Sequence, residues 1–172
     1  MTANEPNLRL PMIIWVQFVF SFLFFAVVLF VVTQDKAPQP DTLTTLGPAM
    51  GFMALFALAS IPLLRTRVQG AQTLFGLMPP LPSGQWNEGL EPDVTRRLLQ
   101  EAAKKYQTGM IIGMAMCEAA VLFGFALGYV SAIPLVIAPF IVGAFLGVVL
   151  QFPTRDGVIA VARALRAAES PQ

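Results

Sequence analysis

Residues 108–130 read TGMIIGMAMCEAAVLFGFALGYV, a run of 23 residues in which Glu118 is the only acidic or basic side chain. A helix needs about 20 mostly apolar residues to cross a hydrocarbon core about 30 Å thick. The stretch is long enough, and it is rich in the small and apolar residues typical of membrane helices. It therefore predicts a transmembrane helix with one carboxyl group near its middle.

Three further stretches have a similar length and composition, at residues 12–32, 43–64 and 133–152. Hydrophobic residues make up 56% of the chain and charged residues only 12%, whereas a soluble domain has about 25% charged residues. The sequence predicts an all-α polytopic membrane protein, with four transmembrane helices in two hairpins. Residues 1–172 are expected to form a single membrane domain.

The first and fourth stretches each allow an alternative interpretation. Residues 12–32 could be a signal peptide, but the apolar core is too long and no small-x-small cleavage pattern follows it, so we expect an uncleaved anchor. Residues 133–152 contain Pro134 and Pro139 in the first turns. Proline is tolerated near a helix start, so we expect a full crossing, with a re-entrant segment as the alternative.

The distribution of Lys and Arg predicts the orientation in the membrane, because cytoplasmic loops are enriched in these residues. With four crossings, ten of the eleven basic residues fall on the side that holds both termini. Those ten are Arg9, Arg65, Arg67, Arg96, Arg97, Lys104, Lys105, Arg155, Arg163 and Arg166. Lys36 alone falls on the other side. We expect a multi-pass protein of the cell inner membrane with both termini in the cytoplasm.

Residues 65–107 form the predicted cytoplasmic segment between the hairpins. From Pro92 onward the sequence favours a helix, because Asp93 lies in its first turn and Lys104 and Lys105 follow late. No helix-breaking residue separates this helix from the third span. The third transmembrane helix is thus predicted to extend into the cytoplasm.

A last short helix is predicted at residues 154–166. Thr154 follows Pro153 and can cap it, and Val158, Val161 and Leu165 share one face. Arginines flank this apolar face. We expect the helix to lie at the membrane interface, held against anionic lipid.

Composition argues against several classes of function. The chain has no histidine and one cysteine, which argues against zinc, haem and copper sites, so no metal and no cofactor are expected. A net charge of +1 gives no indication of a nucleic-acid partner. No catalytic constellation is recognisable, and we do not expect an enzyme.

Glycines mark the predicted contacts between helices. Gly109, Gly113, Gly124 and Gly128 fall within an arc of about 100° on the third helix, and Gly143 and Gly147 are four residues apart in the fourth stretch. Small residues let membrane helices approach closely. We expect these glycines to pack against neighbouring helices.

Glu118 is the one candidate for a chemical role. An ionised side chain at mid-membrane costs several kcal/mol, about 2.5–3.5 even on the mildest scale, and no basic residue lies within any predicted span. Desolvation favours the neutral form, so we expect a protonated carboxyl that donates a hydrogen bond. Ser21 and Gln17 lie at matching depth in the first span and are the candidate partners.

Two interpretations of Glu118 stay open. In the first, the carboxyl is structural and joins helices through a hydrogen bond to Ser21 or Gln17. In the second, it is an ion-binding site that alternates between protonated and ionised states. An intramembrane acid is by default a candidate functional residue.

Residues 110–127, MIIGMAMCEAAVLFGFAL, resemble the second helix of rotary ATP synthase c subunits, the proteolipids. In that family the helix also rises from the cytoplasmic side, and its mid-membrane Glu, followed by Ala and then an aromatic–Gly pair, carries a proton or sodium ion. The resemblance implies that Glu118 is an ion-binding carboxylate. It covers these 18 residues, and the glycine-rich first helix and short loop of that family have no counterpart here.

Two functional hypotheses follow. The first is a structural or assembly subunit of an inner-membrane complex, with the lipid bilayer and other membrane subunits, or further copies of the chain, as partners. The alternative is proteolipid-like translocation of a proton or cation through Glu118.

Overall fold

The computed structural model describes residues 8–69 and 91–169, and the regular secondary structure of these ranges is entirely helical. In chain order the elements are α1 (Arg9–Thr33), α2 (Pro40–Gln69), α3 (Pro92–Ser131), the 3₁₀ helix η1 (Pro134–Val136), α4 (Ile137–Val149) and α5 (Arg155–Glu169). The predicted all-α class is confirmed. Residues 70–90 of the predicted cytoplasmic segment lie outside the described residues.

Three helices are long and apolar enough to cross a membrane: α1, α2 over Pro40–Arg65, and α3. A shorter apolar helical stretch, Pro134–Val149, comprises η1 and α4. Its rise per residue gives an axial length of about 25 Å, below the bilayer core of about 30 Å. The predicted count of four crossings is therefore not confirmed, because this helix ends at Val149 and not near residue 152.

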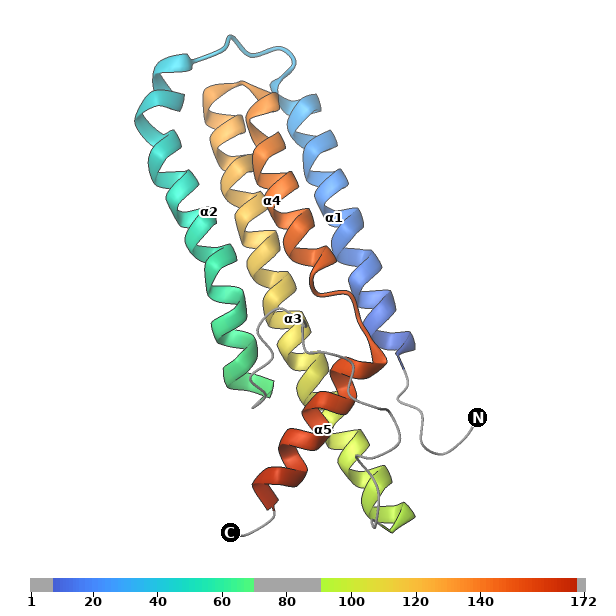
Figure 1. The fold of residues 1–172 in the computed structure, drawn as a ribbon. Coiled ribbons are helices and arrows are strands. Elements are labelled where there is room, and N and C mark those ends of the chain that lie inside the picture. Colours follow the sequence, from blue (N-terminus) through green and yellow to red (C-terminus); the bar gives the residue numbers. More distant parts are fainter. Residues whose placement is uncertain (1–7, 70–90, 170–172) are drawn as a thin grey trace.

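The long helix α3 occupies the centre of the fold. It packs against α1, α2, α4 and α5, whereas α1 and α2 lie on opposite sides of the α3–α4 pair (Figure 1). Among the described residues, α1 and α2 show no comparable packing on each other. The two-hairpin arrangement is not confirmed, since only α3 and α4 form a hairpin of packed neighbours.

The turn between α3 and α4 is stabilised by backbone hydrogen bonds. Ala132 adopts a left-handed conformation with φ of 54°, which ends α3, and its N–H donates to the Gly128 carbonyl. The Ile133 N–H donates to the same carbonyl at 3.1 Å. From the loop between α1 and α2, the Gln39 N–H donates to the Ser131 carbonyl at 2.7 Å. This bond joins the two connections at the same end of the bundle.

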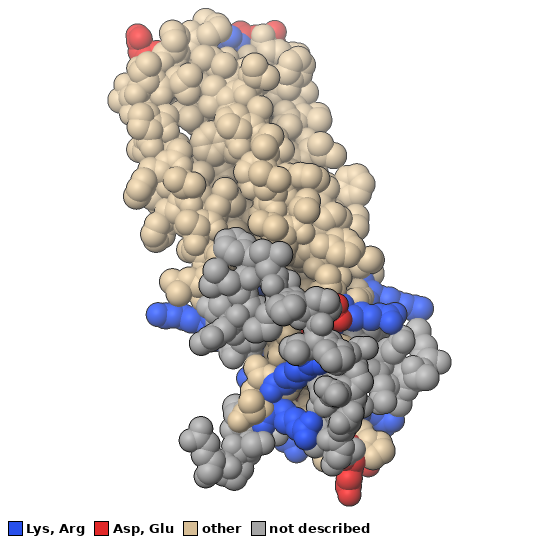
Figure 2. Space-filling model, viewed as in Figure 1, with Lys and Arg blue, Asp and Glu red and all other residues tan. Residues whose placement is uncertain are grey.

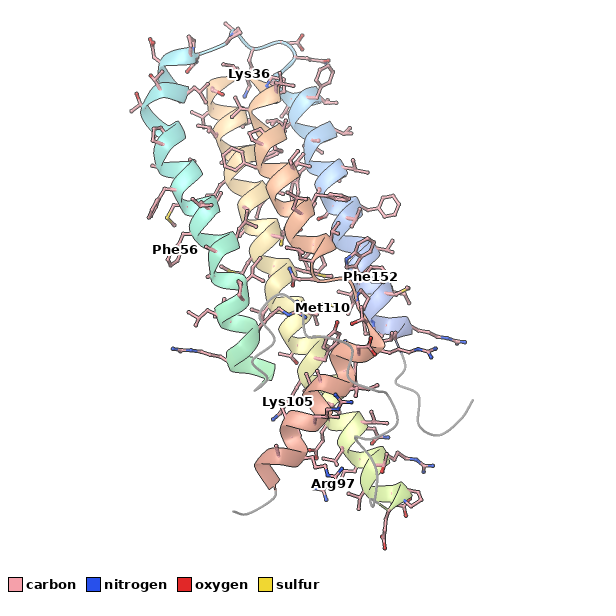
Figure 3. The ribbon with its side chains drawn as sticks, viewed as in Figure 1. Lys36, Phe56, Arg97, Lys105, Met110 and Phe152 are labelled. Carbon is pink, nitrogen blue, oxygen red and sulfur yellow. The ribbon has the colours of Figure 1, made fainter. Side chains whose placement is uncertain are left out.

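The charged side chains gather at the two ends of the bundle. Figure 2 shows a broad uncharged band, with most basic residues beyond its lower edge and a small charged group at its upper edge. Lys36 lies at the upper end, whereas Lys105 and Arg97 lie at the lower end (Figure 3). Both termini of the described chain are also at this basic end (Figure 1).

The last helix, α5, packs on the part of α3 that extends beyond the apolar band. Thr154 accepts a hydrogen bond from the Gly157 N–H at 3.2 Å, which confirms the predicted cap. The apolar face of α5 contacts α3 in a buried cluster formed by Leu99, Ala102, Tyr106, Val158, Val161 and Ala162. The apolar face that the sequence assigns to the membrane interface is therefore covered by protein.

Substitution of the α3 glycines should destabilise the bundle according to the space that surrounds each one. At Gly124 an added Cβ would lie 2.6 Å from the Phe140 ring, whereas at Gly51 in α2 it would meet nothing within 4 Å. We expect Gly124→Ala to lower the free energy of unfolding in detergent by about 1–3 kcal/mol, because the contact becomes overpacked. Gly51→Ala, the matched control, should be neutral or stabilising by up to about 1 kcal/mol. Equal effects of the two variants would contradict this packing.

The packing of α5 on α3 also makes a testable prediction. Val161→Asp places an unpaired charge in the buried contact, which should release α5. We expect trypsin to cleave at Arg163 and Arg166 about tenfold faster, since a penalty of about 1.4 kcal/mol already raises local unfolding tenfold. Ala167→Asp, at an exposed position of the same helix, should leave the cleavage rate unchanged.

Candidate functional site

Glu118 lies at the edge of the face of α3 that its neighbours leave open. We define the outer face of α3 as Ile111, Ala115, Glu118, Leu122 and Tyr129, which follow one another at helical spacing. Four of these side chains are exposed, and Glu118 is half-buried. The carboxyl thus belongs to the surface that would meet lipid or another protein.

The depth of Glu118 follows from the pairing of α1 with α3. Both helices begin at the basic end of the bundle and run in the same direction (Figure 1). The rings of Phe25 and Phe125 lie 5.8 Å apart, which sets the two helices in register. Seven residues earlier on each helix, Phe18 is level with Glu118. On α3 itself, Glu118 is 13 residues from Lys105 at the basic end and 13 from Ser131 at the other end, so the carboxyl lies near the middle of the uncharged band.

The two predicted partners of Glu118 lie near this level but do not bond to it. The Ser21 hydroxyl donates to the Phe18 carbonyl of its own helix at 2.8 Å. Gln17 is exposed on the outside of α1. Within residues 8–69 and 91–169, Glu118 makes no hydrogen bond to either side chain. The structure therefore brings the three residues to one depth without joining them.

The glycine face of α3, formed by Gly109, Gly113, Gly124 and Gly128, points the other way. Gly109 is buried, an added Cβ at Gly124 would meet Phe140 of α4, and one at Gly128 would lie 2.7 Å from Leu29 of α1. Gly124 and Gly128 therefore leave no room for a side chain. The glycine face is therefore the covered face.

The glycines of α4 also lie at close contacts. An added Cβ at Gly143 would lie 3.2 Å from Leu58 of α2. At Gly147 it would lie 2.7 Å from Cys117 Sγ of α3. The fourth helix therefore approaches two neighbours through its small residues.

Gln151 is a buried polar residue that the sequence analysis does not single out. It follows the end of α4 and is only 1% exposed. Its Nε2 donates to the Gly147 carbonyl at 3.1 Å and to Cys117 Sγ at 3.5 Å. The amide packs on Gly113, where even a methyl group would overlap it. The glycine at residue 113 therefore makes room for a polar side chain, and not only for a neighbouring helix.

The oxygen and the nitrogen of the Gln151 amide differ in their hydrogen bonding. Gln151 Oε1 is buried and has no hydrogen-bond partner among the described residues. A glutamine close to the end of an apolar run and two residues before a proline was the available sequence signal. That signal identifies a helix end but gives no indication of burial.

The described residues also contain no group of three or more His, Cys, Asp or Glu side chains that could hold a metal ion.

The chain matches no known protein family, no curated protein and no solved structure. Its function must therefore be inferred from its own residues.

The environment of Gln151 predicts a strong response to a small change. Gln151→Glu keeps the shape of the side chain but removes both donated hydrogen bonds and introduces a charge in a buried site. We expect a clear fall in the melting temperature of the purified protein. Gln100→Glu, the same substitution at an exposed position of α3, should have no effect. A similar melting temperature for both variants would argue against the burial of this amide.

Proposed function

We propose that this chain is a structural or assembly subunit of a complex in the cell inner membrane, and that it docks within the bilayer through the outer face of α3. In this proposal the chain crosses the membrane four times, with both termini in the cytoplasm. The single observation on which it depends is the position of Glu118, an acid at mid-depth on an open helix face.

The basic end of the bundle supports the proposed orientation. Ten of the eleven Lys and Arg residues of the chain belong to that end, and cytoplasmic segments carry such an excess. The fourth crossing is supported by the packing of α4 along α3, which keeps it within the same apolar band (Figure 1). The mismatch of about 5 Å with an average bilayer core is one that local thinning can accommodate.

The outer face of α3 has the properties of a helix-docking surface. Ala115 is exposed and Ala119 is half-buried, and they are four residues apart, which allows a second helix to approach closely. Glu118 lies beside them on the helix surface, about 60° from Ala115. In hydrocarbon, a hydrogen bond between polar groups of two helices stabilises their association by about 0.6–2 kcal/mol. A partner helix on this face would both cover the apolar side chains and satisfy the carboxyl.

The alternative function is translocation of a proton or cation through Glu118. The same location favours it, because a carboxyl at the lipid-facing edge of a helix can change its protonation state when an adjoining subunit brings water or a cation to it. The resemblance of residues 110–127 to the ion-carrying helix of c subunits also supports this alternative. An assembly subunit needs Glu118 as a hydrogen-bonding group, whereas an ion carrier needs its carboxyl to change protonation state or to bind and release a cation.

Two substitutions of Glu118 separate the two functions. Gln keeps the size and the hydrogen-bonding capacity of a protonated Glu, whereas Leu removes both the donor and the acceptor. For an assembly subunit, we expect Glu118→Gln to retain the complex seen on native gels of mildly solubilised membranes, and Glu118→Leu to lose it. For an ion carrier, Glu118→Gln should abolish pH-driven flux in proteoliposomes while the protein stays folded by circular dichroism.

A photo-crosslinking amino acid tests the docking surface directly. Placed at Leu122 on the outer face of α3, it should crosslink to protein in intact membranes. Placed at Phe56, which points outward from α2 (Figure 3), it should crosslink to lipid. Crosslinking of Leu122 to lipid alone would rule out docking on this face.

A further inference from the structure

A groove with a volume of about 200 Å³ lies between α2 and α4, at the end where basic residues gather. Its walls are apolar, with Leu58 and Ile61 from α2 and Leu146 from α4. Gly143 and Gly147 also line it. Because glycine has no side chain, α4 approaches α2 closely here, and an added Cβ at Gly143 would lie 3.2 Å from Leu58. Leu146 is more than half exposed, so the groove is open toward the surroundings of the bundle.

The lining of the groove includes one positively charged residue. Arg65 belongs to the lining and lies in the last turns of α2, where the uncharged band ends. Its guanidinium carbon is 5.9 Å from the centre of the Tyr106 ring, a cation–π contact that orients the side chain. No acidic residue lines the groove, and no carboxylate forms a salt bridge with Arg65 within the part of the chain that the structure describes. Its guanidinium therefore has donors available for an anion.

The polar and apolar parts of the lining are arranged along the helix axis. Arg65 and Gln151 are at the basic end, whereas Leu58 lies two helical turns farther into the apolar band on α2 and Gly143 lies eight residues before Gln151, within α4. This order matches a molecule with an anionic head and an apolar tail. An apolar void of about 150 Å³ already admits a molecule as large as benzene, so the groove has room for part of one acyl chain.

We propose that this groove binds one anionic glycerophospholipid, with an acyl chain along Leu58, Ile61 and Leu146 and the headgroup phosphate on the Arg65 guanidinium. Arginine pairs with phosphate oxygens through two parallel hydrogen bonds. A zwitterionic lipid carries its own ammonium group, which competes with Arg65 for the phosphate. Basic pockets between membrane helices on the cytoplasmic side recognise anionic headgroups in this way.

The lipid site is separate from the docking surface of α3. Gly147 in the groove contacts Cys117, on the covered side of α3, whereas Glu118 belongs to the outer face. The inference depends on membrane insertion but not on the role of Glu118. If the proposed role of Glu118 is wrong, the proposed lipid site is not affected, and the converse also holds.

Native mass spectrometry of the purified full chain tests the lipid site. With phosphatidylglycerol added, we expect one lipid to stay bound, and with phosphatidylcholine at the same concentration much weaker retention. Arg65→Gln should weaken phosphatidylglycerol binding about tenfold, as expected for loss of a charged hydrogen bond. Arg67→Gln, which removes the same charge from an exposed position two residues away, should leave binding unchanged. Inorganic phosphate should not displace the lipid, because it lacks the acyl chain.

A second pair of variants tests the apolar part of the groove without changing charge. Leu146→Trp should fill the groove and abolish retention of the lipid. Val142→Trp adds the same bulk to an exposed position of α4 outside the groove and should retain it. Circular dichroism confirms that each variant is folded. Equal retention of both lipids, equal effects of Arg65→Gln and Arg67→Gln, or full retention in folded Leu146→Trp would each overturn the proposal.

Discussion

The close approach of α3 to its neighbours at the glycine face is the contact on which the rest of the structure depends. Lipid tails are as apolar as the helices, so burial of apolar surface does not drive membrane helices together. Association of the helices therefore depends on dispersion between closely packed atoms, and this attraction weakens rapidly with distance. At Gly124 and Gly128 the side chains of Phe140 and Leu29 occupy the space that a methyl group would fill. These contacts place α4 and α1 around α3.

Once the glycine face is covered, the opposite side of α3 is left open. α1 and α2 pack on α3 from two sides with no comparable packing on each other, and the outer face of α3 is left as an exposed strip of the described chain. Glu118 is at the edge of this strip. A carboxyl there is costly in hydrocarbon unless it is neutral and bonded. This cost is the basis for proposing that a partner subunit, or an exchanging proton or cation, meets this surface.

The same packing explains the buried Gln151 and the neighbouring groove. α4 ends at Val149, and the chain then turns inward so that the Gln151 amide lies against Gly113. The Trp15 indole of α1 donates to the Val148 carbonyl at 2.9 Å and fixes this end of α4. On the α2 side, the groove is lined by Leu58, Ile61, Gly143 and Gly147. A short fourth helix thus produces both a buried amide and a groove with Arg65 in its lining.

From the sequence alone we could predict the apolar character of the long helices, the unbroken run of α3 from Pro92, the capping role of Thr154 and the gathering of basic residues at one end. These properties depend on composition and periodicity along a single segment, and they can be read without knowing the neighbours. The tertiary structure was needed to show that α1 and α2 lie apart, that α5 packs on α3, that α4 stops short, and that Gln151 is buried. One cause is that α4 is apolar around its whole circumference and α1 around most of it. Hydropathy therefore gives no indication of which face of these helices is buried. That face is determined by close packing between segments that are distant in the sequence.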